Sequence, residues 1–406
     1  MNLKDVIETP EAFSKFEWSQ RLYDQQAVAP EDIKASFLPA LKRVKALQNY
    51  LTEVFVGDHM RRNIRMMLAA AIAQEPTLFV GGPGLAKTEL AVAFFESIGL
   101  RKPVSAEDQG KENKYYEYLL SAFTVPEELF GPYRIDLLKE GKFVRNNTNM
   151  LTGQGVRACF LDEVFKGSSN ILNTLLTLIN ERRYFNDGAF QQSDLRIILG
   201  AANTTPASAS SGFSGKIELP GKSGNELMAF YDRFTVRLYF EPPETAQVNE
   251  ISASDFFRIR EKSIEREAFK LGHARPFQFS PEARPCLNDF LLLSRTLFLH
   301  LISPKVGVLQ QPSDRWVELF LRMGMNLARE ESSMVRISPR KMTRLEKLAY
   351  ALALLDHLDH TPKANAKEKV MVENRHCEVF SYAWESEFLR PQLVRQVEQQ
   401  IGVGLE

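Results

Sequence analysis

The chain has 406 residues, of which 44% are hydrophobic and 25% are charged, a composition typical of a globular protein long enough for two or three domains. Lysine and arginine together number 51, as do aspartate and glutamate, so the overall charge favours neither nucleic acid nor a membrane surface as a partner. No apolar run reaches membrane-spanning length, the N-terminus lacks the plan of a signal peptide, and the three cysteines are far apart. We therefore expect no membrane span, a reducing compartment and a cytoplasmic location.

Residues 1–45 have mixed charge and are interrupted by prolines, and we expect them to form a short helical extension. From residue 46 to residue 73, apolar residues recur at helical spacing on both sides of Gly57, which predicts two helices. A nucleotide base can pack near such a junction, so Gly57 is a candidate base contact. Two core-facing helices are the simpler account of the individual residues there.

A glycine-rich turn follows the apolar run 77–80, which has the length and composition of a buried parallel strand. Apolar residues then resume helical spacing up to Gly99. Such a turn directs backbone N–H groups and the positive end of a helix dipole at one point, where polyphosphate can bind. The predicted phosphate-binding residues are Gly81, Gly82, Pro83, Gly84, Leu85, Ala86, Lys87, Thr88 and Glu89.

Within this loop, Lys87 is placed to contact the outer phosphates of ATP, and the Thr88 hydroxyl to bind Mg²⁺. Ala86 departs from the strict pattern, which has glycine immediately before the lysine. An ordinary glycine-rich turn therefore remains the alternative for the loop taken alone.

Polar side chains follow two further apolar runs. The run 158–161 predicts a buried strand that delivers Asp162 and Glu163 to the carboxyl edge of a parallel sheet. There Asp162 would bind Mg²⁺, and Glu163 would orient and polarise the attacking water. The run 195–199 leads to Asn203, which we expect to contact that water or the γ-phosphate; the alternative is a turn-forming asparagine.

An Asp-Gly turn between aromatic residues predicts a hairpin shortly before the last of these runs. Residues 207–225 are small and polar, which is typical of a surface loop. A helix is then predicted over residues 226–234, ahead of a strand over 236–240. Arg233 is a candidate arginine finger, a side chain that one subunit supplies to its neighbour's nucleotide.

Beyond residue 242 the apolar spacing is helical throughout, which predicts an all-α second domain. One helix begins with Ser338 as N-cap and Pro339 at its first position, and its apolar face extends to Leu355. Arg340 projects from the first turn of this helix.

These segments are similar in order and spacing to those of the MoxR family of AAA+ ATPases, and most closely to its RavA-like branch. The resemblance covers roughly residues 45–385. It rests on Ala86 before Lys87, on Asn203, and on the segments 124–131, 161–166, 171–176, 180–182 and 231–234.

The resemblance implies an α/β fold, with a P-loop αβα sandwich of the AAA+ type over residues 46–241 and an all-α lid domain over 242–406. Residues 126–154 would form the insert in helix 2 that marks one clade, and residues 183–194 the hairpin before the sensor 1 residue Asn203. Arg233 matches the arginine finger, with Arg182 as its rival. Arg340 matches sensor 2, where it would contact the γ-phosphate.

By the same resemblance, the protein would be an ATPase that requires ATP and Mg²⁺ and forms a hexameric ring with nucleotide. Arg233 would arrive from the neighbouring subunit. The expected function is chaperone-like: to remodel or mature a protein complex, with a partner that contains a von Willebrand factor A (vWA) domain. Two alternatives stay open, a nucleic-acid translocase, against which the balanced charge argues, and a scaffold whose nucleotide site serves assembly. The sequence identifies neither client nor partner.

Overall fold

The structure, a computed structural model, describes residues 30–100, 114–186, 188–206, 224–240, 257, 260, 261, 264, 279, 284–302, 308–329, 338–360, 369–384 and 390–402. Most of the predicted extension, residues 1–29, and most of the predicted loop, residues 207–223, lie outside the described residues.

The elements of the first part of the chain are α4 (Pro30–Val54), α5 (Asp58–Ala73), β1 (Thr77–Val80), α6 (Lys87–Ser97), β2 (Tyr115–Leu119), α7 (Pro126–Phe130), α8 (Ile135–Leu138), β3 (Ala158–Asp162), the 3₁₀ turn η2 (Val164–Lys166), α9 (Ser169–Glu181), β4 (Arg183–Asn186), β5 (Ala189–Gln192), β6 (Ile197–Ala202), α11 (Gly224–Tyr231) and β7 (Val236–Tyr239). The helical part that follows contains α13 (Leu287–Ile302), α14 (Asp314–Arg329), α15 (Pro339–His360), the 3₁₀ helix η3 (Asn374–Tyr382) and α16 (Arg390–Ile401).

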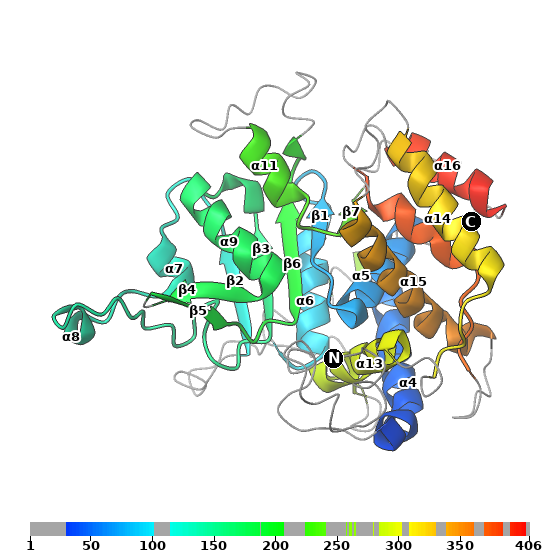
Figure 1. The fold of residues 1–406 in the computed structure, drawn as a ribbon, viewed down its shortest axis with the longest axis horizontal. Helices are drawn as coiled ribbons and strands as arrows, with labels where there is room; N and C mark the ends of the chain where they lie inside the picture. Colours follow the sequence, from blue (N-terminus) through cyan, green and yellow to red (C-terminus); the bar gives the residue numbers. More distant parts are fainter. Residues whose placement is uncertain are drawn as a thin grey trace, which may run out of the picture.

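A parallel sheet with the strand order β2-β3-β6-β1-β7 forms the centre of the first part (Figure 1). The crossover from β1 to β2 runs along the sheet in one direction, and the later crossovers run in the other. Because such crossovers are right-handed, α6 covers one face, whereas α9 and α11, which contact each other, cover the other. All residues of β1 and β6 are buried, as expected for strands covered on both faces. The predicted α/β fold followed by a helical domain is therefore confirmed.

The bounds of β6 differ most from the expected run 195–199, because the strand begins at Ile197 and continues through Gly200 to Ala202. Small residues carry little apolar signal, yet they pair with β1 and β3 in register. A Cβ at Gly200 would lie 3.0 Å from the Phe234 ring and 3.1 Å from Val164 Cγ1, so a larger residue has little room there.

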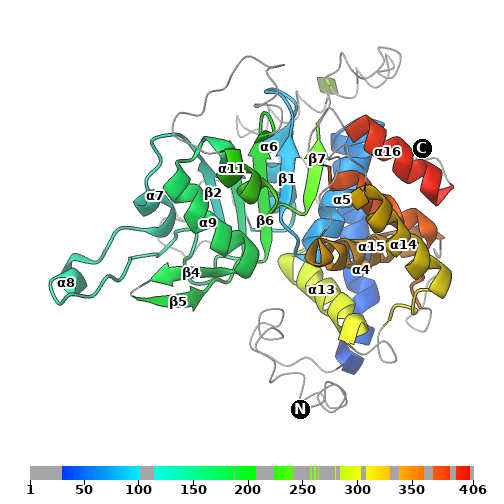
Figure 2. The same ribbon diagram turned by 45° about the horizontal axis from the view of Figure 1, so that its top comes forward.

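Two arms extend from the sheet on the side of β2 (Figures 1 and 2). One is the segment around α8, within the predicted insert 126–154, and the other is the β4-β5 hairpin predicted by the Asp-Gly turn. Arg145 closes the base of the first arm: its guanidinium donates to Gly131 O at 2.8 Å and lies 4.1 Å from the centre of the Tyr133 ring.

The helical part lies beside β7, at the opposite edge of the sheet (Figure 1). Helix α4 packs against α5 and α6 as well as against α13 and α15 of this part. The expected division between residues 45 and 46 falls inside α4, because the helix is continuous from Pro30 to Val54. Along the described ranges, no helix is long and apolar enough to cross a membrane.

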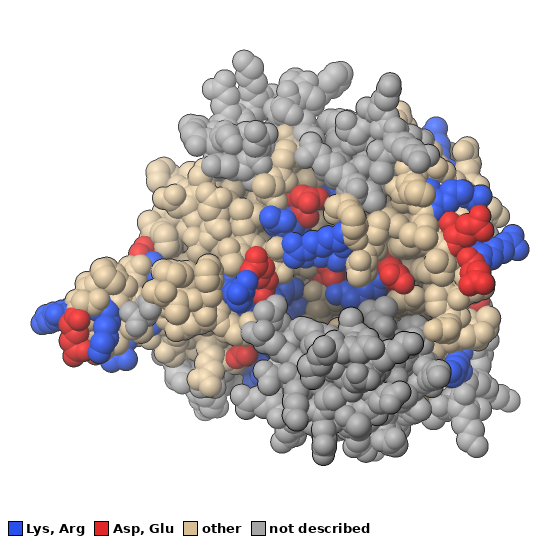
Figure 3. Space-filling view, in the orientation of Figure 1, with Lys and Arg blue, Asp and Glu red and all other residues tan. Residues whose placement is uncertain are grey.

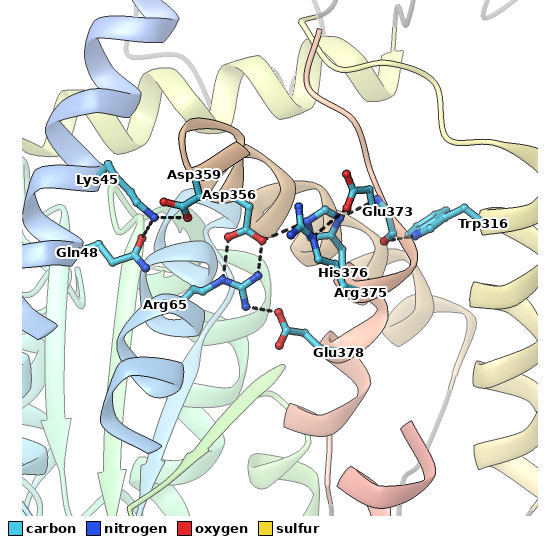
Figure 4. A network of polar contacts seen from close by, with 10 residues as sticks. All are labelled: Lys45, Gln48, Arg65, Trp316, Asp356, Asp359, Glu373, Arg375, His376 and Glu378. Atoms are coloured by element: carbon cyan, nitrogen blue, oxygen red, sulfur yellow. Dashed lines mark hydrogen bonds and ion pairs between the residues drawn. The ribbon is translucent and has the colours of Figure 1, made fainter. Parts of the chain in front are cut away.

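A buried polar network joins α5 to the helical part (Figure 4). Arg65 donates through Nε and Nη2 to Asp356 of α15, at 2.9 and 2.5 Å, and through Nη1 to Glu378 of η3. His376 Nε2 lies 3.3 Å from Asp356 Oδ2. A single cation on α5 therefore holds carboxylates of both α15 and η3.

Candidate nucleotide site

The predicted phosphate loop lies between β1 and α6, as the sequence indicated. Gly81 donates its N–H to Ala202 O at 3.2 Å, which joins the loop to the end of β6. A Cβ at Gly81 would lie 2.5 Å from Phe240 O, so only glycine fits beside β7. The loop is thus held against both strands that flank β1.

Ala86 caps α6 with a left-handed backbone, at φ 61° and ψ 17°. This conformation costs an L-residue about 1–2 kcal/mol, whereas glycine adopts it freely. The geometry explains why the strict pattern has glycine before the lysine. It also shows that Ala86 keeps the loop geometry and does not abolish it.

The Lys87 side chain turns back into the loop and is only 7% exposed. Its ammonium donates to Gly81 O, to Gly82 O at 2.7 Å and to Asn203 Oδ1 at 3.2 Å. Burial lowers the pKa of Lys87, and the nearby charges of Asp162 and Glu163 oppose that shift. The Lys87 ammonium is therefore held by oxygen acceptors of the loop and of Asn203, beside the N-terminus of α6, where a polyphosphate can bind.

Thr88 and Asp162 face each other across the end of the loop. Thr88 Oγ1 donates to Asp162 Oδ2 at 2.9 Å, and β3 ends at Asp162. A hydroxyl and a carboxylate supply the hard oxygen ligands that Mg²⁺ prefers, so this pair fits the ion that accompanies ATP.

Glu163 follows in a left-handed conformation, at φ 53° and ψ 43°. Its Oε1 accepts a hydrogen bond from Asn203 Nδ2 at 2.6 Å and lies 3.2 Å from Lys166 Nζ. The Asn203 amide therefore bridges Lys87 and Glu163. Sequence reasoning gave no role to Lys166, although its spacing of three residues from Glu163 was the available signal.

Gly57 lies immediately before α5, as its N-cap residue. Further along α5, the Asn63 side chain donates to Tyr239 O at 2.9 Å. Tyr239 is paired in register with Val80, the last residue of β1. The start of α5 is thus placed near the loop, and the base contact at Gly57 stays a prediction.

The candidate arginines lie near the amino ends of the strands. Burial, followed by repulsion from Arg344 and Arg233, lowers the pKa of Arg340, and Glu181 and Glu75 partly offset this. Glu75 precedes β1 and Arg233 precedes β7, so both mark the amino ends of the strands, whereas the loop lies at their carboxyl ends. Arg340 lies one turn before Arg344, whose guanidinium donates to Thr235 Oγ1 at 3.2 Å immediately before β7, and its contact with a γ-phosphate stays a prediction.

Arg182 and Arg233 differ in their surroundings. The half-buried Arg182 side chain donates to Gln74 O at 3.1 Å and to Ile179 O, and desolvation lowers its pKa to about 10. Arg233 is half-buried, and its Nε has no hydrogen-bond partner within the described structure. Arg182 is therefore bonded within its own subunit, and the choice of Arg233 as the finger stays a prediction.

Comparisons with known proteins identify the family of the chain. Residues 42–274, more than half of the chain, match the family bpMoxR, described as the MoxR domain in the MoxR-vWA-beta-propeller ternary systems. Two uncharacterised proteins of Methanocaldococcus jannaschii are similar: MJ0079 is 35% identical over 198 residues, and MJ0812 is 38% identical over 178 residues. These matches cover 48% and 44% of this chain but only 43% and 39% of the relatives.

A crystal structure from Cytophaga hutchinsonii, described as a "putative ATPase", has a similar fold. Its TM-score is 0.59 at 14% sequence identity, and the match covers 93% of this chain and 98% of that one. At this identity the likeness concerns the fold alone, and the RavA-like branch stays a prediction. The family match, the P-loop fold and the grouping of Lys87, Asp162 and Glu163 agree, and the chain belongs to the MoxR family of AAA+ ATPases.

Proposed function

We propose that this protein is an ATP-hydrolysing motor that assembles as a hexameric ring and remodels or matures a protein complex, with a partner that contains a vWA domain. The observation that supports hydrolysis is the grouping of Lys87, Thr88, Asp162, Glu163 and Asn203 at one edge of the sheet. The family match, described for systems that contain vWA proteins, supports the choice of partner.

The residues of the site divide the work of phosphoryl transfer. Backbone N–H groups of the loop and the Lys87 ammonium would hold the phosphates, and Thr88 with Asp162 would hold Mg²⁺. The bound ATP-Mg²⁺ supplies the bond to be cleaved and the divalent charge that neutralises the phosphates. Glu163 orients and polarises the attacking water, and Asn203 positions Glu163.

Arg233 and Arg340 complete the site from the neighbouring subunit in this proposal. Arg233 precedes Thr235 by two residues, and Arg340 precedes Arg344, which donates to Thr235 Oγ1 at 3.2 Å, by one helical turn, so one ring contact would bring both arginines to the next subunit's nucleotide. Arg233 serves as the finger because Arg182 is already bonded within its own subunit. Arg340, on the first turn of α15, would report the neighbour's nucleotide to the helical part.

Mixing two inactive variants tests the proposal. Arg233→Ala should bind ATP but hydrolyse it about a thousandfold more slowly, and Glu163→Gln should bind and not hydrolyse. In an equimolar mixture, about a quarter of the interfaces combine an intact Glu163 with an intact Arg233 from the neighbour, so activity should return. A mixture as inactive as its components would refute action between subunits. Size-exclusion chromatography with ATP should show a hexamer, and a monomer at saturating ATP would contradict the ring.

Capture of bound molecules tests the remodelling role. Tagged Glu163→Gln protein, purified from its native cell with ATP, should retain a vWA protein or a multi-subunit complex that a Lys87→Ala control does not. Nuclease-sensitive nucleic acid in its place would favour a translocase. The charges of the arm argue against that outcome, since Arg134 pairs with Asp136 at 2.6 Å and Lys142 with Glu140 at 2.9 Å, and both signs are mixed at this end of the molecule (Figure 3).

A further inference from the structure

Lys166 touches the carboxylate that the proposed mechanism uses. Its Nζ lies 3.2 Å from Glu163 Oε1, and the same oxygen accepts the Asn203 amide at 2.6 Å. One carboxylate oxygen therefore holds two donors, one of them charged.

The local fold keeps Lys166 in this place. The 3₁₀ turn η2 begins directly after Glu163, and Lys166 N donates to Glu163 O at 2.8 Å. In a 3₁₀ turn, side chains three residues apart lie on the same side. Val164 and Phe165 anchor the turn in the core, at 0% and 8% exposure. The approach of Lys166 to Glu163 thus follows from the backbone of the turn.

This contact acts on the atom that catalysis needs. A general base must present a lone pair to the water that it polarises, within hydrogen-bond reach. Donors already bound to Glu163 Oε1 compete with that water. Lys166 is also the last member of a continuous chain of polar contacts. Asn203 donates to Glu163, and its Oδ1 accepts a hydrogen bond from Lys87, the residue expected to contact the phosphates.

We propose that Lys166 is a positioning residue that holds Glu163 in a resting orientation and so restrains basal ATP hydrolysis. This inference rests on the proposed ATPase function. The Lys166 side chain is 56% exposed and that of Glu163 is 17% exposed, so the contact opens by rotation of a surface side chain and leaves the core unchanged.

The size of the restraint follows from this exposure. Exposed ion pairs are weak, and their loss corresponds to a factor of about two to five in an equilibrium or a rate. We expect Lys166→Met to raise basal kcat about two- to fivefold, because methionine keeps the stem and removes the donor. Lys166→Arg keeps a cation at this position and should hydrolyse ATP at the wild-type rate.

The experiment measures kcat and KM for ATP in the full-length wild type, Lys166→Met, Lys166→Arg and a control, Lys142→Met. The Lys142 side chain is also 56% exposed and pairs with a carboxylate, Glu140. Lys142 lies beside α8, since its N–H donates to Leu137 O, and α8 is far from the strand β1 that leads into the phosphate loop (Figure 1). Titration with a fluorescent, non-hydrolysable ATP analogue gives affinity independently of hydrolysis. A rise in kcat for Lys166→Met alone, with analogue affinity within about twofold of wild type, supports the inference.

An unchanged or reduced kcat for Lys166→Met, in a protein whose wild type hydrolyses ATP, overturns the inference and leaves the ATPase proposal intact. A rise of equal size in Lys142→Met also overturns it, since the effect would then follow from loss of any exposed lysine. If all four proteins bind the analogue and none of them hydrolyses ATP, the ATPase proposal is overturned, and this inference with it.

Discussion

Replacement of Arg65 by methionine tests whether the buried ion pairs of Figure 4 hold α5 to the helical part. Arg65 bonds both oxygens of Asp356 and one oxygen of Glu378. The side chains of these acids are only 8% and 6% exposed. Methionine keeps much of the apolar stem but would leave two carboxylates buried without their cation.

The magnitude follows from this burial. Loss of one partner of a buried ion pair costs about 3–5 kcal/mol, because the remaining charge stays desolvated. His376 offsets part of the cost: its Nδ1 accepts the Glu373 N–H at 2.8 Å, which leaves Nε2 as the protonated nitrogen facing Asp356. We therefore expect the free energy of unfolding to fall by about 3 kcal/mol, at the lower end of the range.

Urea unfolding followed by circular dichroism measures this loss, and Arg61→Met is its control. Arg61 is on the same helix, one turn earlier, and pairs with Asp58 at 3.3 Å with both side chains exposed, at 65% and 79%. Such a pair contributes about 0–1 kcal/mol. Equal midpoints for the two variants would refute the reasoning, because the buried network would then stabilise the protein no more than a surface pair.

Three further predictions follow from single contacts. Ala86→Gly should stabilise the protein by about 0.5–1 kcal/mol in urea unfolding, since it removes the left-handed strain of an L-residue but adds freedom to the unfolded chain; a loss of stability would contradict the strain. Gly81→Ala should lower the urea midpoint and abolish binding of a fluorescent ATP analogue, because its Cβ would meet Phe240 O at 2.5 Å. In Gly82→Ala the nearest atom is at 3.9 Å, so this variant should keep the wild-type midpoint, and equal midpoints for the two variants would refute the argument. Burial would raise the pKa of Glu75, but the charges of Lys347 and Arg344 outweigh burial and leave the pKa below its usual value. The Glu75 carboxylate therefore stabilises the fold above about pH 4.5, and this stabilisation is lost as pH falls through the folded-state pKa. The difference in Tm between wild type and Glu75→Gln should therefore shrink below about pH 4, and a constant difference would show that the charge of Glu75 is not responsible.

Local patterns in the sequence were sufficient to predict most of the nucleotide site. The phosphate loop and the acids after β3 follow apolar runs, and parallel strands bring their carboxyl ends to one edge. Asn203 was predicted at this edge for the same reason, although β6 extends further than its apolar run. The Ser338 side chain accepts the Lys341 N–H at 3.2 Å, as expected of the N-cap that was predicted for α15.

The placement of Arg340 was not predictable in the same way. A helix start can be inferred from its cap, but the edge of the sheet at which that helix lies depends on contacts between distant segments. Here Arg344 donates to Asn180 Oδ1 at 2.8 Å and Lys347 lies 2.5 Å from Glu75 Oε1. These contacts span more than 160 residues, so no local pattern carries them. The part played by Lys166 was missed for a different reason, since a lysine three residues after an acid is common on surfaces.

The continuity of α4 bears on how the protein can be divided. Phe37, Leu41 and Val44 on its first half are buried, at 2%, 0% and 0% exposure, and the helix contacts α13 and α15 as well as α5. A fragment that begins at residue 46 would lose this half of the helix and open apolar surface on both parts of the molecule at once. Any movement of the helical part relative to the sheet would therefore have to change the contacts that α4 makes with one part or the other.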